Sequence, residues 1–144
     1  MAIRVLFLCT ANSCRSQMAE GWARALHPRT IAAFSAGMQP SAVHPLAVQV
    51  MREAGVDISG QYAKSMEQFL DERFDCVVTL CGGANEACPV FPGGVLRLHV
   101  DFDDPAAVAG SPEEMLAAFR RVRDEIHDLV AELPGFISNP QGSA

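Results

Sequence analysis

Residues 3 to 22 read IRVLFLCTANSCRSQMAEGW and indicate the fold most clearly. The first six residues of this stretch are mostly apolar and rich in β-branched and aromatic side chains, which is typical of a strand buried on both faces of a parallel sheet. From Arg15 onward the spacing becomes helical, with Met18, Trp22 and Leu26 four residues apart, until Pro28 ends the run. The stretch therefore predicts a strand, a loop and a helix.

The same alternation continues along the chain. We expect further strands over residues 31–36, 75–80 and 94–100, and a second helix over residues 45–54. A last helix begins at Ser111-Pro112-Glu113-Glu114, which has the pattern of a capping box, and Pro134-Gly135 is expected to stop it. This order predicts an α/β fold: a single domain over residues 1–138 with a four-stranded, mostly parallel sheet flanked by helices on both faces. Residues 139–144 are predicted to be a mobile tail.

Composition narrows the classes of protein. The chain has 144 residues, of which 49% are hydrophobic, as expected of one globular domain. A net charge of −6, from 11 basic and 17 acidic residues, leaves no broad basic surface for nucleic acid or an anionic membrane, so neither is expected as a partner. Because the apolar runs are too short to span a bilayer and the start lacks the layout of a signal peptide, the sequence predicts a cytoplasmic protein.

Five cysteines are the unusual feature: Cys9, Cys14, Cys76, Cys81 and Cys88. An odd number without a leader argues against a disulfide framework and leaves buried thiols, metal ligands or redox chemistry. There is no C-x2-C pair and no nearby pair of histidines, which disfavours a structural zinc site. No metal site is predicted.

Residues 9–16, here called the anion loop, read CTANSCRS, a C-x5-R-S pattern at the turn from strand to helix. Ligands bind at the carboxyl ends of parallel strands, and the N–H groups and dipole of a helix N-terminus favour an anion. A tetrahedral oxyanion is therefore expected to bind residues of this loop, namely Thr10, Ala11, Asn12, Ser13, Cys14, Arg15 and Ser16.

Cys9 is the predicted nucleophile, because the field that holds an anion also stabilises a thiolate and the Ser16 hydroxyl is placed to donate to its sulfur. The alternative is that Cys9 is a buried thiol at the end of a strand and Arg15 a solvated helix residue. The position of the motif, after the first strand, favours the functional interpretation.

These residues carry a resemblance. The sequence resembles the low-molecular-weight protein tyrosine phosphatase superfamily, and within it the thioredoxin-coupled arsenate reductases, from Val5 to about Leu129. The matching motifs are residues 9–21, residues 77–82 (VVTLCG), Cys88-Pro89, residues 102–105 (FDDP) and residues 121–126 (RVRDEI).

The resemblance implies a relay of three thiols. Cys9 attacks arsenate while Asp104 assists the loss of an oxygen as water, Cys81 then attacks Cys9 and arsenite leaves, and Cys88 finally attacks Cys81. Thioredoxin reduces the resulting disulfide. If residues 81–88 were helical, their end Cα atoms would lie about 10.5 Å apart, beyond the roughly 4.4–6.8 Å of a disulfide, so this segment must refold. The remaining thiols are expected to be bystanders, Cys76 as a packed thiol and Cys14 without assigned chemistry.

Two other functions stay open. A phosphatase acting on aryl or tyrosyl phosphate would need only Cys9, Arg15 and Asp104. A sensor of oxyanions or of redox state would use the same loop without turnover. The acid assignment is itself complicated by two neighbouring carboxylates, Asp101 and Asp103.

One departure from related reductases concerns potassium. Several of them bind this ion through residues matching Asn12, Glu20 and Ser35 and through a further acidic residue, which here aligns with Lys64. An ammonium at that position removes a ligand and adds a positive charge. We therefore expect Lys64 to stand in for the ion, activity to be indifferent to potassium, and no cofactor to be tightly bound.

Overall fold

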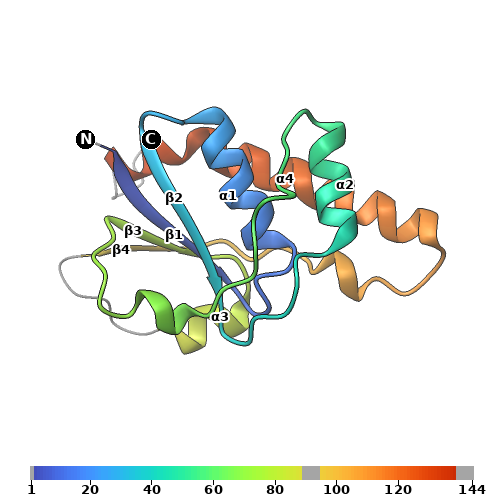
Figure 1. Ribbon diagram of the computed structural model, residues 1–144, viewed down its shortest axis with the longest axis horizontal. Helices are drawn as coiled ribbons and strands as arrows, with labels where there is room; N and C mark the ends of the chain where they lie inside the picture. Colours follow the sequence, from blue (N-terminus) through green and yellow to red (C-terminus); the bar gives the residue numbers. More distant parts are fainter. Residues whose placement is uncertain (1, 89–94, 139–144) are drawn as a thin grey trace.

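The computed structural model describes residues 2–88 and 95–138 and shows a parallel sheet of four strands in the order β2-β1-β3-β4 (Figure 1). The strands are β1 (Ile3–Cys9), β2 (Ile31–Gly37), β3 (Cys76–Thr79) and β4 (Leu96–His99). All three pairings are parallel, and Val5 of β1 lies between Ala33 and Cys76. The predicted α/β fold is confirmed, with a sheet that is wholly parallel over the described residues.

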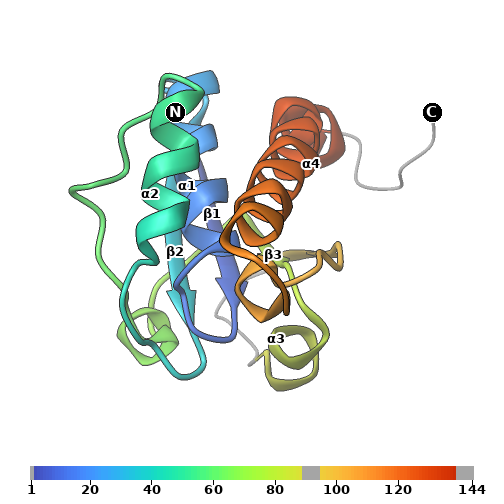
Figure 2. The ribbon, with the colours of Figure 1, turned by 90° about the vertical axis from the view of Figure 1, so that its right-hand side faces the viewer.

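Helices cover the two faces unequally. Figures 1 and 2 show α1 (Arg15–Leu26), α2 (Pro45–Glu53) and α4 (Pro112–Ser138) together on one side of the sheet. The other side carries α3 (Gly82–Ala87) and a short 3-10 helix, η1 (Met66–Phe69), and the ring of Phe69 packs on that of Phe34 in β2. A second 3-10 helix, η2 (Pro105–Ala107), precedes α4. Helices therefore lie on both faces, as predicted.

The core is centred on β1, whose residues from Val5 to Leu8 are fully buried, as expected of a strand covered on both sides. The strands β3 and β4 are shorter than the predicted runs, and Gly94 and the predicted tail 139–144 lie outside the described residues. Over the part of the chain that the structure describes, no helix combines the length and the apolar character needed to cross a membrane.

The end of α4 differs from the prediction. Its start is the expected capping box, since Ser111 Oγ accepts from the N–H of Glu114 at 3.1 Å. The expected stop at Pro134-Gly135 is wrong, because the helix runs through Pro134 to Ser138. Pro134 has no N–H to give to the carbonyl of Val130, but a ring nitrogen of His27 lies 2.8 Å from that carbonyl oxygen. The carbonyl keeps a partner and the helix continues.

Candidate active site

The anion loop lies where predicted, between the last residue of β1 and the first turn of α1. Figure 2 looks toward this end of the sheet. Cys9 ends the strand and Arg15 begins the helix. No side chain caps the N-terminus of α1, and its first turn holds no acidic residue. The N–H groups and the positive end of the helix dipole therefore remain available to an anion.

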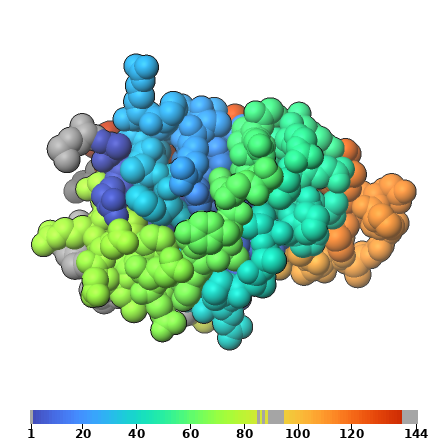
Figure 3. Space-filling model, in the orientation of Figure 1, coloured from blue at the N-terminus to red at the C-terminus, as the bar shows by residue number. Residues whose placement is uncertain are grey.

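A neighbouring segment, residues 37–44, holds the loop from outside. Its backbone N–H groups donate to loop carbonyls in four bonds of 2.9–3.3 Å: Met38 to Cys9, Gln39 to Thr10, Ser41 to Ala11 and His44 to Ser13. In a planar trans peptide the N–H points opposite to the carbonyl, so these bonds turn the loop N–H groups toward the interior of the loop. Figure 3 shows residues from about 38 to 70, cyan to green, on the surface of this face of the molecule.

The loop encloses a pocket of about 270 Å³. Its lining consists of the loop residues Cys9, Thr10, Ala11, Ser13, Cys14 and Arg15, together with Ser41, Asp104 and Ala106 from two other segments. Two predicted oxyanion ligands, Asn12 and Ser16, are fully buried and do not line this pocket. They support the loop from behind.

Polar groups surround the nucleophile. Cys9 is almost completely buried, and its sulfur lies 2.9 Å from the Ser16 hydroxyl, which can donate to a thiolate. The buried guanidinium of Arg15 donates to the carbonyl of Phe102 at 3.1 Å, and its second terminal nitrogen lies 3.9 Å from Asp104 Oδ2. Asp104 Oδ1 accepts from the N–H of Ala106 and so begins η2. The predicted nucleophile, cation and acid are thus brought to one pocket.

A second thiol lies against the loop. The sulfur of Cys81, at the N-terminus of α3, accepts from the N–H of Ala84 and lies 3.3 Å from the Thr10 hydroxyl. Cys88 lies at the other end of the same helix. Burial raises the pKa of the Cys88 thiol, and the nearby guanidinium of Arg97 acts in the opposite direction. The two cysteines are therefore separated by an intact helix.

The remaining two cysteines, Cys14 and Cys76, are buried, and neither forms a disulfide. Burial raises the pKa of both Cys14 and Cys76 to about 12, so both are neutral thiols near pH 7. Cys76 lies within β3, which agrees with its prediction as a packed thiol. Cys14 reaches the pocket wall, but its sulfur is protonated.

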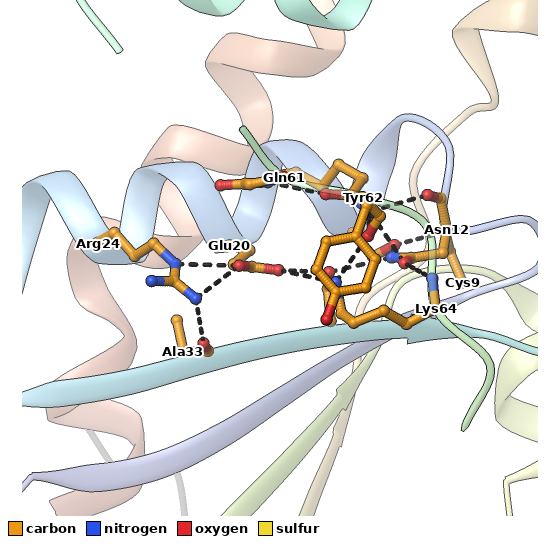
Figure 4. Close-up of polar contacts among 11 residues, drawn as sticks. Cys9, Asn12, Glu20, Arg24, Ala33, Gln61, Tyr62 and Lys64 are labelled. Atoms are coloured by element: carbon orange, nitrogen blue, oxygen red, sulfur yellow. Dashed lines mark hydrogen bonds and ion pairs between the residues drawn. The ribbon is translucent and has the colours of Figure 1, made fainter. Parts of the chain in front are cut away.

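A charged cluster around the buried carboxylate of Glu20 lies behind Asn12, beside a larger pocket of about 550 Å³ (Figure 4). The Glu20 carboxylate accepts from Ser35 Oγ at 2.6 Å and faces two cations, Arg24 at 2.8 Å and Lys64 at 3.7 Å. Burial lowers the pKa of Lys64, while Glu20 acts in the opposite direction. With two cations already at this carboxylate, the cluster does not fit a resident potassium ion. No group of three or more metal-binding side chains occurs within residues 2–88 and 95–138.

Several supporting residues were not predicted as parts of the site. They are the 37–44 segment, the Phe102 carbonyl, Gln17 and Gln61. A backbone N–H or a helical glutamine carries no distinguishing signal in sequence. Asn12 has a φ of 50°, in the left-handed region that asparagine tolerates better than most residues.

Comparison with known proteins defines the class. The family model for low molecular weight phosphotyrosine protein phosphatase matches residues 4–139, and the chain belongs to this family. Within the family, its relatives include the arsenate reductase of Halalkalibacterium halodurans, 50% identical over 122 residues, which are 85% of this chain and 88% of the relative.

Solved structures agree with this assignment. An arsenate reductase in a phosphate-binding state has a TM-score of 0.72 and 36% identity, with 94% of this chain and 98% of that chain covered. A thioredoxin-dependent arsenate reductase from Corynebacterium glutamicum has a TM-score of 0.71 and 26% identity, with 96% of this chain and 63% of that chain covered. The resemblance stated from the sequence is confirmed.

Proposed function

We propose that the protein reduces arsenate to arsenite with three thiols and that thioredoxin restores them. The observation that carries the proposal is the 3.3 Å contact between the Thr10 hydroxyl and the Cys81 sulfur, which puts a second thiol against the loop that contains Cys9. A phosphatase needs no such thiol, whereas a two-electron reduction without a bound redox cofactor does.

The first step is addition to arsenate. The Cys9 thiolate attacks arsenic, and an As–O bond breaks as Asp104 donates a proton, so that the oxygen leaves as water. The loop N–H groups and the Arg15 fork bind the remaining oxygens. Arsenic is still pentavalent in the resulting Cys9 adduct.

The second step is the reduction. The Cys81 thiolate attacks the Cys9 sulfur, a Cys9–Cys81 disulfide forms, and the electron pair of the S–As bond leaves with arsenic as arsenite. The Cys88 thiolate then attacks the Cys81 sulfur and releases Cys9 as a thiolate. The remaining Cys81–Cys88 disulfide takes two electrons from thioredoxin.

The phosphatase alternative requires a different pocket wall. Beyond the anion loop, the pocket is bounded by Ser41, Asp104 and Ala106, and none of its described lining residues is aromatic. An aryl phosphate would find no ring to stack on. A small inorganic oxyanion requires only the loop itself.

The test supplies arsenate, thioredoxin, thioredoxin reductase and NADPH and follows NADPH consumption. Wild type is expected to turn over, and Cys9→Ser, Cys81→Ser and Cys88→Ser are each expected to lose turnover. The matched control is Cys76→Ser in β3, which removes a thiol outside the relay. Steady turnover by Cys81→Ser or Cys88→Ser would exclude the relay, and no turnover by wild type would favour a sensor.

A further inference from the structure

We infer that Gln17 is a positioning residue of the oxyanion site, because its side-chain amide supplies the one bond to the carbonyls of residues 9–13 that the 37–44 segment does not. The inference rests on the part of the proposed function in which Cys9 is the nucleophile of an oxyanion pocket. It does not depend on which oxyanion is turned over.

The carbonyls of residues 9–13 are all hydrogen-bonded away from the pocket. Backbone N–H groups of the 37–44 segment bind four of them, at residues 9, 10, 11 and 13. The fifth, the carbonyl of Asn12, accepts from Gln17 Nε2 at 3.0 Å. Among the hydrogen bonds of the described residues, the carbonyl of Asn12 is the one carbonyl of residues 9–13 that a side chain binds. The N–H of Ser13, which belongs to the same planar peptide, therefore points away from Gln17.

Gln17 has a single favourable orientation. It lies in the first turn of α1 and is fully buried. Its Nε2 faces three oxygens at 2.9–3.0 Å, the carbonyl and the Oδ1 of Asn12 and the carbonyl of Tyr62. Its Oε1 accepts from Gln61 Nε2 at 2.8 Å. Acceptors on one end and a donor on the other define the amide orientation.

The residue that Gln17 holds is the left-handed point of the loop. Asn12 has a φ of 50°, in the left-handed region that disfavours most residues with a side chain and that asparagine tolerates better than most. Asn12 Nδ2 donates to Ser16 Oγ at 2.7 Å, and that hydroxyl lies 2.9 Å from the Cys9 sulfur. The path from Gln17 to the nucleophile is therefore two side chains long, through Asn12 and Ser16. Figure 4 shows Asn12 beside Gln61 and Tyr62.

A packing role alone would predict a different result from a positioning role. Packing would make Gln17 matter for the stability of the α1 end, with the pocket unchanged. Positioning makes it matter for the direction of the Ser13 N–H and for the Ser16 hydroxyl beside Cys9. Oxyanion affinity and the pH dependence of Cys9 reactivity separate the two roles.

The experiment uses Gln17→Met in the full chain, because methionine has a similar length and no N–H group. Inorganic phosphate is the probe, and its protection of Cys9 against iodoacetamide is followed by mass spectrometry as a function of pH. We expect phosphate to protect about 10-fold less well, and the midpoint of Cys9 alkylation to move to higher pH. Unchanged protection and an unchanged midpoint would overturn the inference, whatever the loss in melting temperature.

A second variant covers the case in which Gln17→Met does not fold. Gln61→Met removes the donor that orients the Gln17 amide but leaves the buried Gln17 side chain in place. We expect phosphate to protect Cys9 about 3-fold less well, and the midpoint of Cys9 alkylation to move to higher pH, as in Gln17→Met. The matched control is Gln68→Met. Gln68 is exposed and lines the same 550 Å³ pocket as Gln61, and its substitution should change neither the phosphate protection nor the alkylation midpoint. No shift in Gln61→Met, or an equal shift in the control, would overturn the inference. Neither readout requires arsenate reduction, so failure of the proposed reductase activity is a separate result.

Discussion

The Thr10 hydroxyl of the anion loop and the Cys81 sulfur, 71 residues apart in the chain, lie 3.3 Å from each other. A hydroxyl at this distance can donate to a thiolate and stabilise it. The contact joins the loop that binds the oxyanion to the helix that carries the second thiol.

Replacing Thr10 with Val removes that donor and keeps the shape of the side chain. We expect arsenite release in a single turnover to slow by roughly 3-fold to 10-fold, the value of one hydrogen bond. Phosphate protection of Cys9 against iodoacetamide, which requires the anion loop but not Cys81, is expected to change little. Thr10→Ser, which retains the hydroxyl, is the control. Equal losses in both assays would show that Thr10 serves the loop rather than Cys81.

Cys88 is expected to limit the last thiol exchange near neutral pH. Burial raises the pKa of Cys88, so its thiolate fraction is small at pH 7 and grows as pH rises toward that pKa. Arg97 opposes this shift, and Arg97→Met should raise the pKa further and slow formation of the Cys81–Cys88 disulfide by up to about 10-fold per pKa unit. The rate of Cys81–Cys88 disulfide formation is measured by mass spectrometry of quenched single turnovers across pH. Arg97→Lys should retain most of the rate, and a pH-independent rate in wild type would contradict the assignment.

Asp104→Asn tests the acid. An asparagine Oδ1 can still accept from the Ala106 N–H and begin η2, but the side chain has no acidic proton to give. Turnover is expected to fall about 100-fold, while phosphate protection of Cys9 stays at the wild-type level. Asp103→Asn, at an exposed side chain paired with Arg121, is the control. Full turnover by Asp104→Asn would assign the proton to another group.

Potassium should have no specific effect on the wild-type protein. Glu20 already faces Arg24 and Lys64, and a third cation would meet two like charges. Lys64→Asp exchanges one of these cations for a carboxylate, and we expect potassium to raise the melting temperature of this variant more than sodium does. Thermal unfolding in KCl and NaCl at equal ionic strength measures both. A higher melting temperature of wild type in KCl than in NaCl, or faster arsenate turnover by wild type in KCl at equal ionic strength, would overturn the prediction.

Gly37 is expected to be required by the loop rather than by its strand. A Cβ at this position would lie 2.8 Å from Asn12 N and Thr10 O, and neither backbone atom can move without shifting the pocket. Gly37→Ala should therefore destabilise the fold by about 1–3 kcal/mol and weaken phosphate protection of Cys9. Urea unfolding gives the first quantity. Gly60→Ala, where a Cβ meets nothing within 4 Å, is the matched control, and similar behaviour of the two variants would refute the argument.

The strand, loop and helix of residues 3–26 were predictable, because the hydrophobic pattern of the sequence and the expected ligand chemistry agree there. The apolar run before Cys9 and the helical spacing after Arg15 put the loop at the carboxyl end of a strand. The proximity of Cys81 to this loop follows from the same rule, since β1 and β3 are parallel neighbours and both cysteines end or follow them.

The supporting contacts could not be predicted, because their partners are distant in the chain or chemically ordinary. Every residue but proline offers a backbone N–H, so nothing distinguishes the donors of the 37–44 segment. Gln17 is a polar residue of a type common on the solvent-facing side of helices, yet its side chain is fully buried. The helix break expected at Pro134 was wrong for a similar reason, since the partner of the released carbonyl is His27, more than 100 residues earlier.

Cys81 lies directly before the first residue of α3, and Cys88 lies directly after its last. The helix therefore affects when these two thiols can be oxidised to a disulfide. The six residues of α3 add about 9 Å along the helix axis between the two cysteines, beyond the roughly 4.4–6.8 Å that a disulfide tolerates, so the dithiol cannot close while α3 is folded. An oxidant in solution therefore meets two separate thiols, one of them buried, rather than a pair ready to form a disulfide. We therefore expect Cys81 and Cys88 to stay reduced and apart until α3 unwinds.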